Sequence, residues 1–299
     1  MSKIDIIKRA IIGESTKLKS KTFWNMELIN LRKSSNKIIP VTISLTSYGE
    51  RASKVVPYTI LSLLKQSFRP QKIILWLDSD NWNENNVPQK LKDLEEFALE
   101  IRFCKDLRSY NKLIPTLGLC NAEIIITVDD DIYYSSNFLE EIYTQHLKTP
   151  DKIITLNFCY PKFVNGNVAS YREWDEYHFV GLEDKFSPML IFPQGFGGVL
   201  YPPDALHEDV TKEELFLKFA PYADDIWFYI MGILKGTEKQ CVVNSKTKYY
   251  FLDLFRQIRT RDRLHDLNVG ESKNDLQLKA LLSHYCLLYT SPSPRDGAT

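Results

Sequence analysis

Three consecutive carboxylates, Asp129, Asp130 and Asp131, directly follow a five-residue apolar run at 124–128. Adjacent carboxylates repel one another, and burial would raise their pKa values. A hard divalent cation such as Mg²⁺ or Mn²⁺ removes that cost, and it commonly joins one or two carboxylates to a diphosphate. If the strand continued through them, Asp129 and Asp131 would share one face and Asp130 the other. The pattern predicts a metal–diphosphate site, and its alternative is a solvated acidic turn that caps a helix near residue 137.

A second acidic pair, Asp224 and Asp225, opens the apolar segment Ile226-Trp227-Phe228. One interpretation is that Asp224 is the N-cap of a helix, which would stabilise it by about 1 kcal/mol. The other makes Asp225 a general base whose reactivity is set by partial burial.

A glycine-rich segment, Gln194-Gly195-Phe196-Gly197-Gly198, would let the backbone approach a ligand closely. It lacks the G-x-G-x-x-G spacing of dinucleotide-binding loops, so alone it indicates no particular ligand.

The elements that must position these residues can be read from apolar periodicity. Apolar runs at 41–47, 72–78, 100–106 and 123–131 predict strands, and helical spacing predicts helices at 55–67, 88–98 and 109–120. This alternation predicts an α/β fold with a mostly parallel sheet and helices on both faces. Beyond residue 132 we expect helices at 137–148 and near 211–219 and 223–234, and short strands within 239–245 and 248–255.

The carboxyl ends of the predicted strands carry the polar residues, and ligands of such sheets bind outside those ends. The residues there are Ser47 and Tyr48, Asp78 to Asp80, Asp106, and Asp129 to Asp131.

Composition excludes several classes of protein. Lys and Arg number 38 and Asp and Glu 38, so no polyanion partner is indicated and we expect no nucleic acid. The five cysteines are widely spaced and form no C-x-x-C pair, which favours a reducing compartment over a disulfide framework. No apolar run reaches the roughly 18 residues of a membrane-spanning helix. We therefore expect a cytoplasmic protein, at the inner face of the membrane if it meets one.

The chain divides into three parts. Residues 1–39 form a leader with nine basic and three acidic residues, which suits either a solvated helix with a linker or a peripheral contact with anionic lipid. Residues 40–285 form the main domain, with a nucleotide-binding half at 40–132 and an acceptor half at 133–285. Residues 286–299 have no periodicity and resemble sequencing-adapter read-through, so we expect this tail to be non-native.

Six motifs in order resemble the inverting GT-A glycosyltransferases of the family 2 type, especially bacterial enzymes of surface-polysaccharide biosynthesis. They are ISLTSYGER, LLKQSFRPQKIILWLD, KDLRSYNKLIPTL, IITVDDD, GFGGVLYPP and ADDIWF. The resemblance covers roughly residues 40–285 and implies a GT-A, Rossmann-like fold.

The resemblance implies a role for each matching residue. Either Asp78 or Asp80 would recognise the base of the nucleotide. The other nucleotide-sugar contacts would come from Thr46, Ser47, Tyr48, Arg51, Asp106, Lys112, Asp129, Asp130, Gly197 and Gly198. The metal would be held by Asp131 with Asp129, and by His265 as in some relatives, although His265 also suits a surface loop. Asp225 would be the catalytic base, with Asp224 in the place of the family's Glu, which leaves open which Asp acts. The family's fourth acid is replaced by Ile132.

The resemblance implies a single displacement with inversion, in which Asp225 deprotonates an acceptor hydroxyl and Mn²⁺ or Mg²⁺ offsets charge on the leaving nucleoside diphosphate. The donor would be a nucleotide-sugar, UDP-linked by family frequency, and the acceptor a glycan or glycolipid of cell-surface polysaccharide synthesis.

Two alternatives remain open. A sugar-1-phosphate nucleotidyltransferase would show G-x-G-x-R after its first strand, where this chain has Ser47 to Arg51 with one glycine. A non-catalytic sugar-binding or scaffold protein of the same fold would not need Asp129, Asp131 and Asp225. The aromatic residues at 171–179 could stack on acceptor sugars or pack their own loop.

Overall fold

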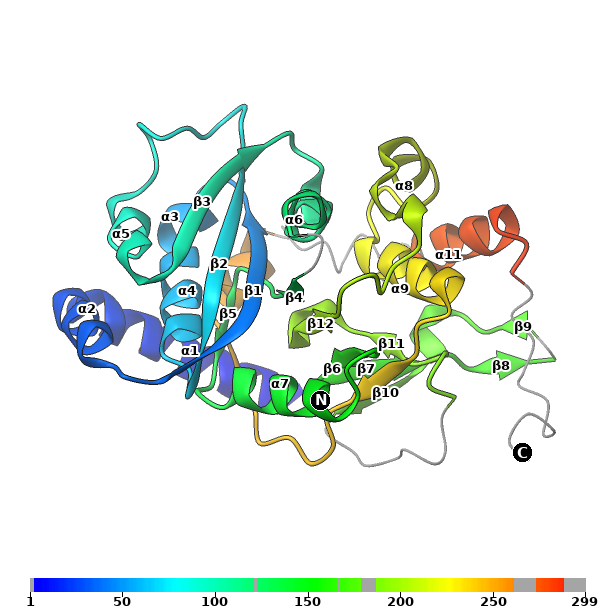
Figure 1. Ribbon diagram of the computed structural model, residues 1–299, viewed down its shortest axis with the longest axis horizontal. Helices are drawn as coiled ribbons and strands as arrows, with labels where there is room; N and C mark the ends of the chain where they lie inside the picture. Colours follow the sequence, from blue (N-terminus) through cyan, green and yellow to red (C-terminus); the bar gives the residue numbers. More distant parts are fainter. Residues whose placement is uncertain (1–2, 121–122, 166, 179–186, 261–272, 288–299) are drawn as a thin grey trace.

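The computed structural model describes residues 3–120, 123–165, 167–178, 187–260 and 273–287. Its centre is a seven-stranded sheet of order β13-β6-β12-β4-β1-β2-β3, in which only β12 runs antiparallel to its neighbours (Figure 1). The strands of this sheet are β1 Lys37–Ser47, β2 Phe68–Asp78, β3 Leu99–Cys104, β4 Ile124–Thr127, β6 Ile153–Thr155, β12 Val199–Tyr201 and β13 Lys239–Cys241. The expected α/β class is confirmed.

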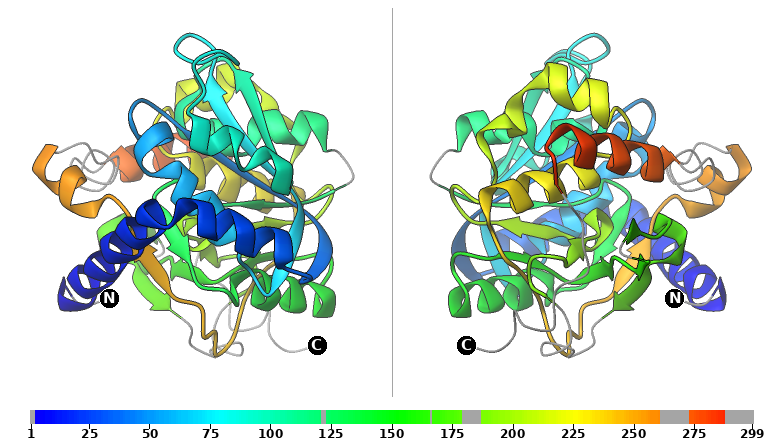
Figure 2. Two further views of the ribbon diagram at one scale, coloured as in Figure 1. Left: turned by 90° about the vertical axis from the view of Figure 1, so that its left-hand side faces the viewer. Right: turned by 90° about the vertical axis from the view of Figure 1, so that its right-hand side faces the viewer.

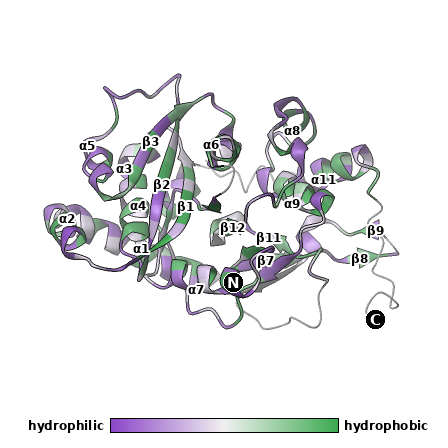
Figure 3. Cartoon of the chain, viewed as in Figure 1, coloured by the Kyte–Doolittle hydropathy of each residue, from purple (hydrophilic) through white to green (hydrophobic). Residues whose placement is uncertain are grey.

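Helices cover both faces of the sheet because alternate strand residues point to opposite sides. On β2, Ile73 and Leu75 enter a core shared with α2, α4, α5 and α7, whereas Ile74 enters a core shared with α8, α9 and α11. The helices are α1 Lys3–Thr22, α2 Trp24–Lys33, α3 Arg51–Lys54, α4 Val56–Leu64, α5 Gln89–Lys92, α6 Ile114–Leu119, α7 Phe138–Lys148, α8 Glu213–Phe219, α9 Asp224–Lys235, α10 Leu254–Thr260 and α11 Lys273–His284. Hydrophobic residues lie along β1 and α9, where these cores meet the sheet (Figure 3).

Smaller elements surround the sheet. β10, β7 and β11 form a three-stranded sheet, β14 pairs with β5, and β8 pairs with β9, all antiparallel. Their bounds are β5 Ile132–Tyr134, β7 Asn157–Tyr160, β8 Phe163–Val164, β9 Asn167–Val168, β10 Asp175–His178, β11 Phe192–Pro193 and β14 Tyr249–Phe251. Short 3₁₀ turns lie at Glu95–Phe97, Arg108–Lys112, Tyr171–Glu173, Gly195–Gly197 and Glu208–Thr211.

Three predicted elements differ in the structure. The expected helix at 88–98 is the single turn α5 followed by a 3₁₀ turn, which ends where Ala98 takes a φ of 77°. The expected helix at 109–120 is divided into a 3₁₀ turn and α6, because Pro115 suits only the first turn of a helix. The expected strand at 123–131 ends at Thr127, so the three carboxylates lie beyond it in a turn.

The leader forms two helices. α2 buries Trp24, Leu28 and Leu31 in the core, and α1 packs on β14. The leader was expected to include a solvated helix, but both of its helices pack against the domain along one face. None of the described helices combines the length and the apolar character that crossing a bilayer requires.

Candidate active site

Lys112 joins the two acidic motifs that the sequence singled out. Its ammonium lies 2.7 Å from Oδ2 of Asp224, 3.3 Å from Oδ1 of Asp225 and 3.8 Å from Oδ1 of Asp129. The side chain of Lys112 is only 9% exposed, so this ion cluster is largely withdrawn from water. Asp129, which follows β4, and Asp225, which lies on α9, are thus brought to one place from 96 residues apart.

The cluster shifts the protonation of its members. Burial alone would lower the pKa of Lys112, but the surrounding carboxylates outweigh it and hold that pKa well above its ordinary value. Burial raises the pKa of Asp225, and repulsion from Asp224 adds to the rise, while Lys112 opposes it. A carboxylate with a raised pKa and a fixed cation beside it is suited to accept a proton.

Arg51, at the start of α3, forms a second ion cluster with the other two carboxylates of the turn that follows β4. Its Nη2 lies 2.7 Å from Oδ1 of Asp130 and 2.6 Å from Oδ2 of Asp131. Ser47 Oγ donates to Oδ2 of Asp130 at 2.5 Å, and Tyr48 lies beneath the guanidinium, 5.4 Å from the ring centroid to Cζ. The end of β1 and the end of β4 therefore converge, as the parallel sheet predicts.

This arrangement corrects the expected pairing of the three carboxylates. Because β4 ends at Thr127, strand alternation does not apply to them. Asp130 and Asp131 share Arg51, whereas Asp129 faces Lys112. The alternative of a solvated acidic turn that caps the next helix is wrong as well, since Asp130 is 7% exposed and the N-cap of α7 is Asn137.

The second acidic pair does not cap its helix by a side chain. The N-cap of α9 is Ala223, with no side-chain capping bond, and the carboxylate of Asp224 faces Lys112 instead. Negative charge at a helix N-terminus is still favoured by the helix dipole. The side chain of Asp224 is 10% exposed and that of Asp225 is 37% exposed, so Asp225 is the more solvent-accessible of the two acids.

The glycine segment contacts the acids through a residue that was not predicted. Gly195 N donates to Oδ2 of Asp225 at 3.1 Å, and a Cβ on Gly195 would come within 2.6 Å of Oδ1 of the same residue. Gly197 and Gly198, which were the predicted glycines, have packing reasons to be glycine. A Cβ on Gly197 would collide with Asn157, and Gly198 has a φ of +83° and lies against Phe138.

Several other predicted residues lie in the same region without joining either cluster. Thr46 Oγ1 donates to the carbonyl of Trp76 at 3.0 Å, and Oδ1 of Asp78 accepts from both N and Nδ2 of Asn81. Asp80 and Asp106 are exposed, and Asp106 accepts from the backbone of Arg108. Each of these contacts holds a strand or a loop in place.

Two predictions concern residues outside the described ranges, one of them wholly and the other in part. His265, the candidate third metal ligand, is not among the described residues. Of the aromatic residues at 171–179, Tyr171 and Trp174 pack on Phe192 with ring centroids 5.6 and 5.5 Å apart, which favours packing of the loop for these two. The side chains of Tyr177, His178 and Phe179 are not among those described.

The sequence also showed no sign of two hydrogen-bonding residues, Gln257 and Tyr134, that contact the acidic turn. Gln257 on α10 donates to Oδ2 of Asp131 at 2.7 Å, and the Tyr134 hydroxyl accepts from the backbone N–H of Asp129 at 3.1 Å and donates to the carbonyl of Phe196 at 3.3 Å. An isolated Gln or Tyr far along the chain carries no local pattern that would reveal such a contact.

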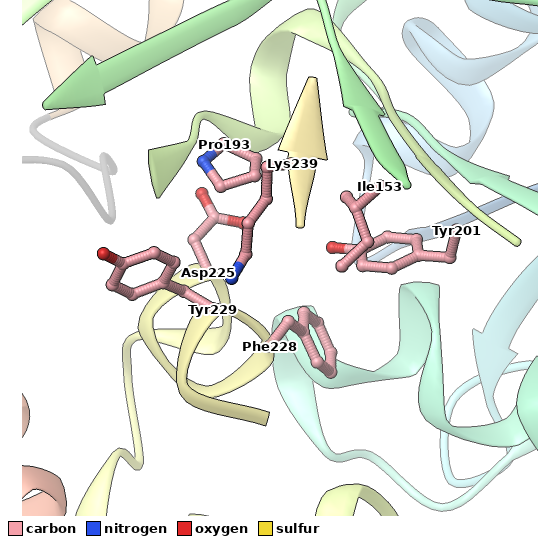
Figure 4. A pocket seen from close by; sticks show the side chains of 7 residues that line it. All are labelled: Ile153, Pro193, Tyr201, Asp225, Phe228, Tyr229 and Lys239. Carbon is pink, nitrogen blue, oxygen red and sulfur yellow. The ribbon is translucent and has the colours of Figure 1, made fainter. Parts of the chain in front are cut away.

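A small cavity lies behind Asp225 (Figure 4). It is lined by Ile153, Pro193, Tyr201, Asp225, Phe228, Tyr229 and Lys239, and it has room for about one water molecule. Lys239 is fully buried there; its Nζ donates to the carbonyl of Met189 at 3.2 Å and lies 5.2 Å from the Tyr229 ring centroid. Burial lowers the pKa of Lys239 to about 7.

The two clusters fit a divalent cation in part. They place five carboxylates against two cations, an excess of negative charge built from hard oxygen donors. No group of three or more His, Cys, Asp and Glu residues is arranged to hold a metal ion within the described ranges. Mg²⁺ and Mn²⁺ commonly use only one or two carboxylates and complete their shell with phosphate oxygens and water. Asp129 and Asp131 would be the carboxylates of that mode, and each of them also faces a cation of the protein, Lys112 or Arg51.

Comparisons with known proteins give neither a family nor a function. No family model and no curated protein matches the chain. Similar solved structures include S. aureus TarS 1-349 in complex with UDP, at 14% identity and a TM-score of 0.47, over 71% of this chain and 60% of that one. A second structure of TarS 1-349 has 15% identity, a TM-score of 0.48 and coverages of 83% and 72%. The inositol-1-phosphate CTP transferase from T. maritima has 9% identity, a TM-score of 0.43 and coverages of 72% and 89%. This chain thus spans about 60% of the first of these, and at such scores none of them supports an argument about function.

Proposed function

We propose that this chain is an inverting glycosyltransferase of the GT-A type, which transfers a sugar from a nucleotide-sugar, UDP-linked, to a glycan or glycolipid acceptor in cell-surface polysaccharide synthesis. The observation that carries the proposal is Lys112, which holds the accessible acid Asp225 beside the acidic turn of β4. A general base and a diphosphate-binding turn are the two parts that a single displacement needs at one place.

In the proposed reaction the acceptor hydroxyl attacks the anomeric carbon on the face opposite the diphosphate. The new bond joins the acceptor oxygen to that carbon, the bond from the carbon to the diphosphate oxygen breaks, and its electron pair leaves with the nucleoside diphosphate. The hydroxyl proton passes to Asp225, whose raised pKa suits it to accept the proton. One base and one displacement give inversion at the anomeric carbon.

The remaining residues of the site bind and orient. Lys112 fixes the carboxylate of Asp225, with help from the N–H of Gly195. Arg51 lies at the acidic turn, and its Nε is buried without a hydrogen-bond partner among the described residues, so it has a donor to offer to a phosphate oxygen. Bound Mn²⁺ or Mg²⁺, held by Asp129 and Asp131, would supply positive charge to the diphosphate.

The location follows from the acceptor. A glycolipid acceptor places the reaction at the inner face of the cytoplasmic membrane, and the basic leader at 1–39 would make a peripheral contact there.

A panel of nucleotide-sugars incubated with the chain and Mn²⁺ tests this function, with EDTA as the control. We expect slow release of nucleoside diphosphate from one donor, and its loss in EDTA. Release of pyrophosphate from a nucleoside triphosphate and a sugar phosphate would instead identify a nucleotidyltransferase. Sugar or nucleotide binding without any release would indicate a non-catalytic protein of this fold.

A further inference from the structure

Exposed apolar side chains are concentrated in the leader. Of the 17 large hydrophobic residues that are exposed in the described chain, nine lie between residues 4 and 38. Soluble surfaces carry such residues singly, and a contiguous group of them marks an interaction site.

The helix α1 has two faces with different partners. One face lies against β14: Ala10 is buried, a Cβ on Gly13 would collide with the carbonyl of Phe251, and Lys17 Nζ donates to the carbonyl of Leu252 at 2.6 Å. The opposite face carries Ile4, Ile7 and Ile11 in one row, and Leu18 continues that row beyond Glu14 and Ser15. We call these four residues the isoleucine stripe.

The isoleucine stripe is turned to solvent although nothing in its composition favours water. Its members are 66%, 49%, 56% and 64% exposed in chain order. Figure 2 shows that the N-terminal part of α1 projects from the body of the molecule.

Basic residues flank the stripe. Lys8, Lys19 and Lys21 are exposed on α1. The leader holds nine basic and three acidic residues while the whole chain is neutral, so positive charge gathers at this end and the rest of the chain carries the negative excess. An apolar row bordered by lysines is the pattern of helices that lie in the interface of a bilayer with anionic lipids.

We propose that the isoleucine stripe, with the lysines beside it, docks α1 flat on the anionic surface of a lipid bilayer. A second copy of this chain is a poorer occupant, because two leaders of the same positive charge would repel each other. The proposal names the surface for the membrane contact suggested above, but lipid binding needs no turnover, so its failure would leave the proposed sugar transfer standing.

Co-flotation of the full chain with vesicles tests the proposal. One set of vesicles contains phosphatidylcholine alone, and the other contains phosphatidylcholine with an equal amount of phosphatidylglycerol. We expect binding to the anionic vesicles, weakened by salt, and more than tenfold weaker partitioning for the double variant Ile7→Glu with Ile11→Glu. Each of Lys8→Gln and Lys19→Gln should weaken partitioning by about fivefold.

The matched control is Leu276→Glu, which changes a leucine that is 67% exposed on α11. It should bind the anionic vesicles as the unchanged chain does. Circular dichroism and the unfolding midpoint show whether each variant folds. The proposal is overturned if the folded double variant floats like the control, or if the unchanged chain ignores anionic vesicles. It is also overturned if the stripe instead drives self-association that the double variant abolishes.

Discussion

Replacing Lys112 with Met removes the cation that three carboxylates share while it keeps the apolar stem. The closest contact, 2.7 Å to Asp224, joins side chains that are 9% and 10% exposed, so water compensates little for the loss. Breaking such a buried pair from one side costs about 3–5 kcal/mol of unfolding free energy. The side chains of Asp225 and Asp129 are more than one-third exposed, so their ion pairs with Lys112 contribute less to the free energy of unfolding.

The assay is urea unfolding of the unchanged chain, Lys112→Met, and the double variant Lys112→Met with Asp224→Asn. Neutralising Asp224 removes the uncompensated charge, so the double variant should recover a large part of the lost stability. The control is Lys105→Met, which breaks an exposed pair with Glu213 at 2.5 Å and should cost about 0–1 kcal/mol. A loss of stability in Lys112→Met no greater than in Lys105→Met, or no recovery on adding Asp224→Asn, would show that Lys112 does not hold a buried ion cluster together.

Three further predictions follow from other parts of the site. Gly195→Ala places a methyl group 2.6 Å from Oδ1 of Asp225 and should lower the free energy of unfolding by about 1–3 kcal/mol, measured by thermal unfolding. The control is Gly118→Ala, whose methyl group meets nothing within 4 Å and should not destabilise the chain. Equal losses in the two variants would contradict the prediction. The pKa of Lys239 is lowered to about 7 in the folded chain, whereas in the unfolded chain it has its ordinary, higher value. At a pH between these two pKa values the unfolded chain therefore carries a proton on Lys239 that the folded chain has lost. Stability should therefore rise with pH above about 7, by up to about 1.4 kcal/mol per pH unit, and Lys239→Met should remove that slope in unfolding curves at pH 7, 8 and 9; an unchanged slope would contradict it. Asp131→Ala should abolish Mn²⁺-dependent release of nucleoside diphosphate yet leave a folded chain, and release at the unchanged rate would exclude Asp131 as a metal ligand.

The strands of the first half were predictable because their central residues are mostly apolar and lie between turn residues. β2 and β4 were found in this way, and with them the ends where Ser47 and Asp129 lie. The end of β4 was misplaced because Val128 continues the apolar run into the turn. That error produced the wrong pairing of the three carboxylates, since alternation was applied to residues that are not on a strand.

Contacts between distant segments were less accessible. Lys112 was expected among the nucleotide-sugar contacts from a family resemblance, but no local pattern shows that it faces Asp224 and Asp225. Gly195 was passed over in favour of Gly197 and Gly198, because sequence does not tell a glycine that approaches a site from one that fits a crowded core. The exposure of the isoleucine stripe depends on which face of α1 meets β14, and the sequence does not show that the small residues Ala10 and Gly13 take that place.

The central claim is that Asp225 accepts a proton during sugar transfer, and nucleoside diphosphate release by Asp225→Asn tests it most directly. This variant should bind the nucleotide-sugar with unchanged affinity and release nucleoside diphosphate to an acceptor about 10²–10⁴-fold more slowly than the unchanged chain. Asp224→Asn, whose carboxylate faces Lys112 and is nearly closed to solvent, should lose less. Undiminished release by Asp225→Asn, or no release from any donor by the unchanged chain, would contradict the account.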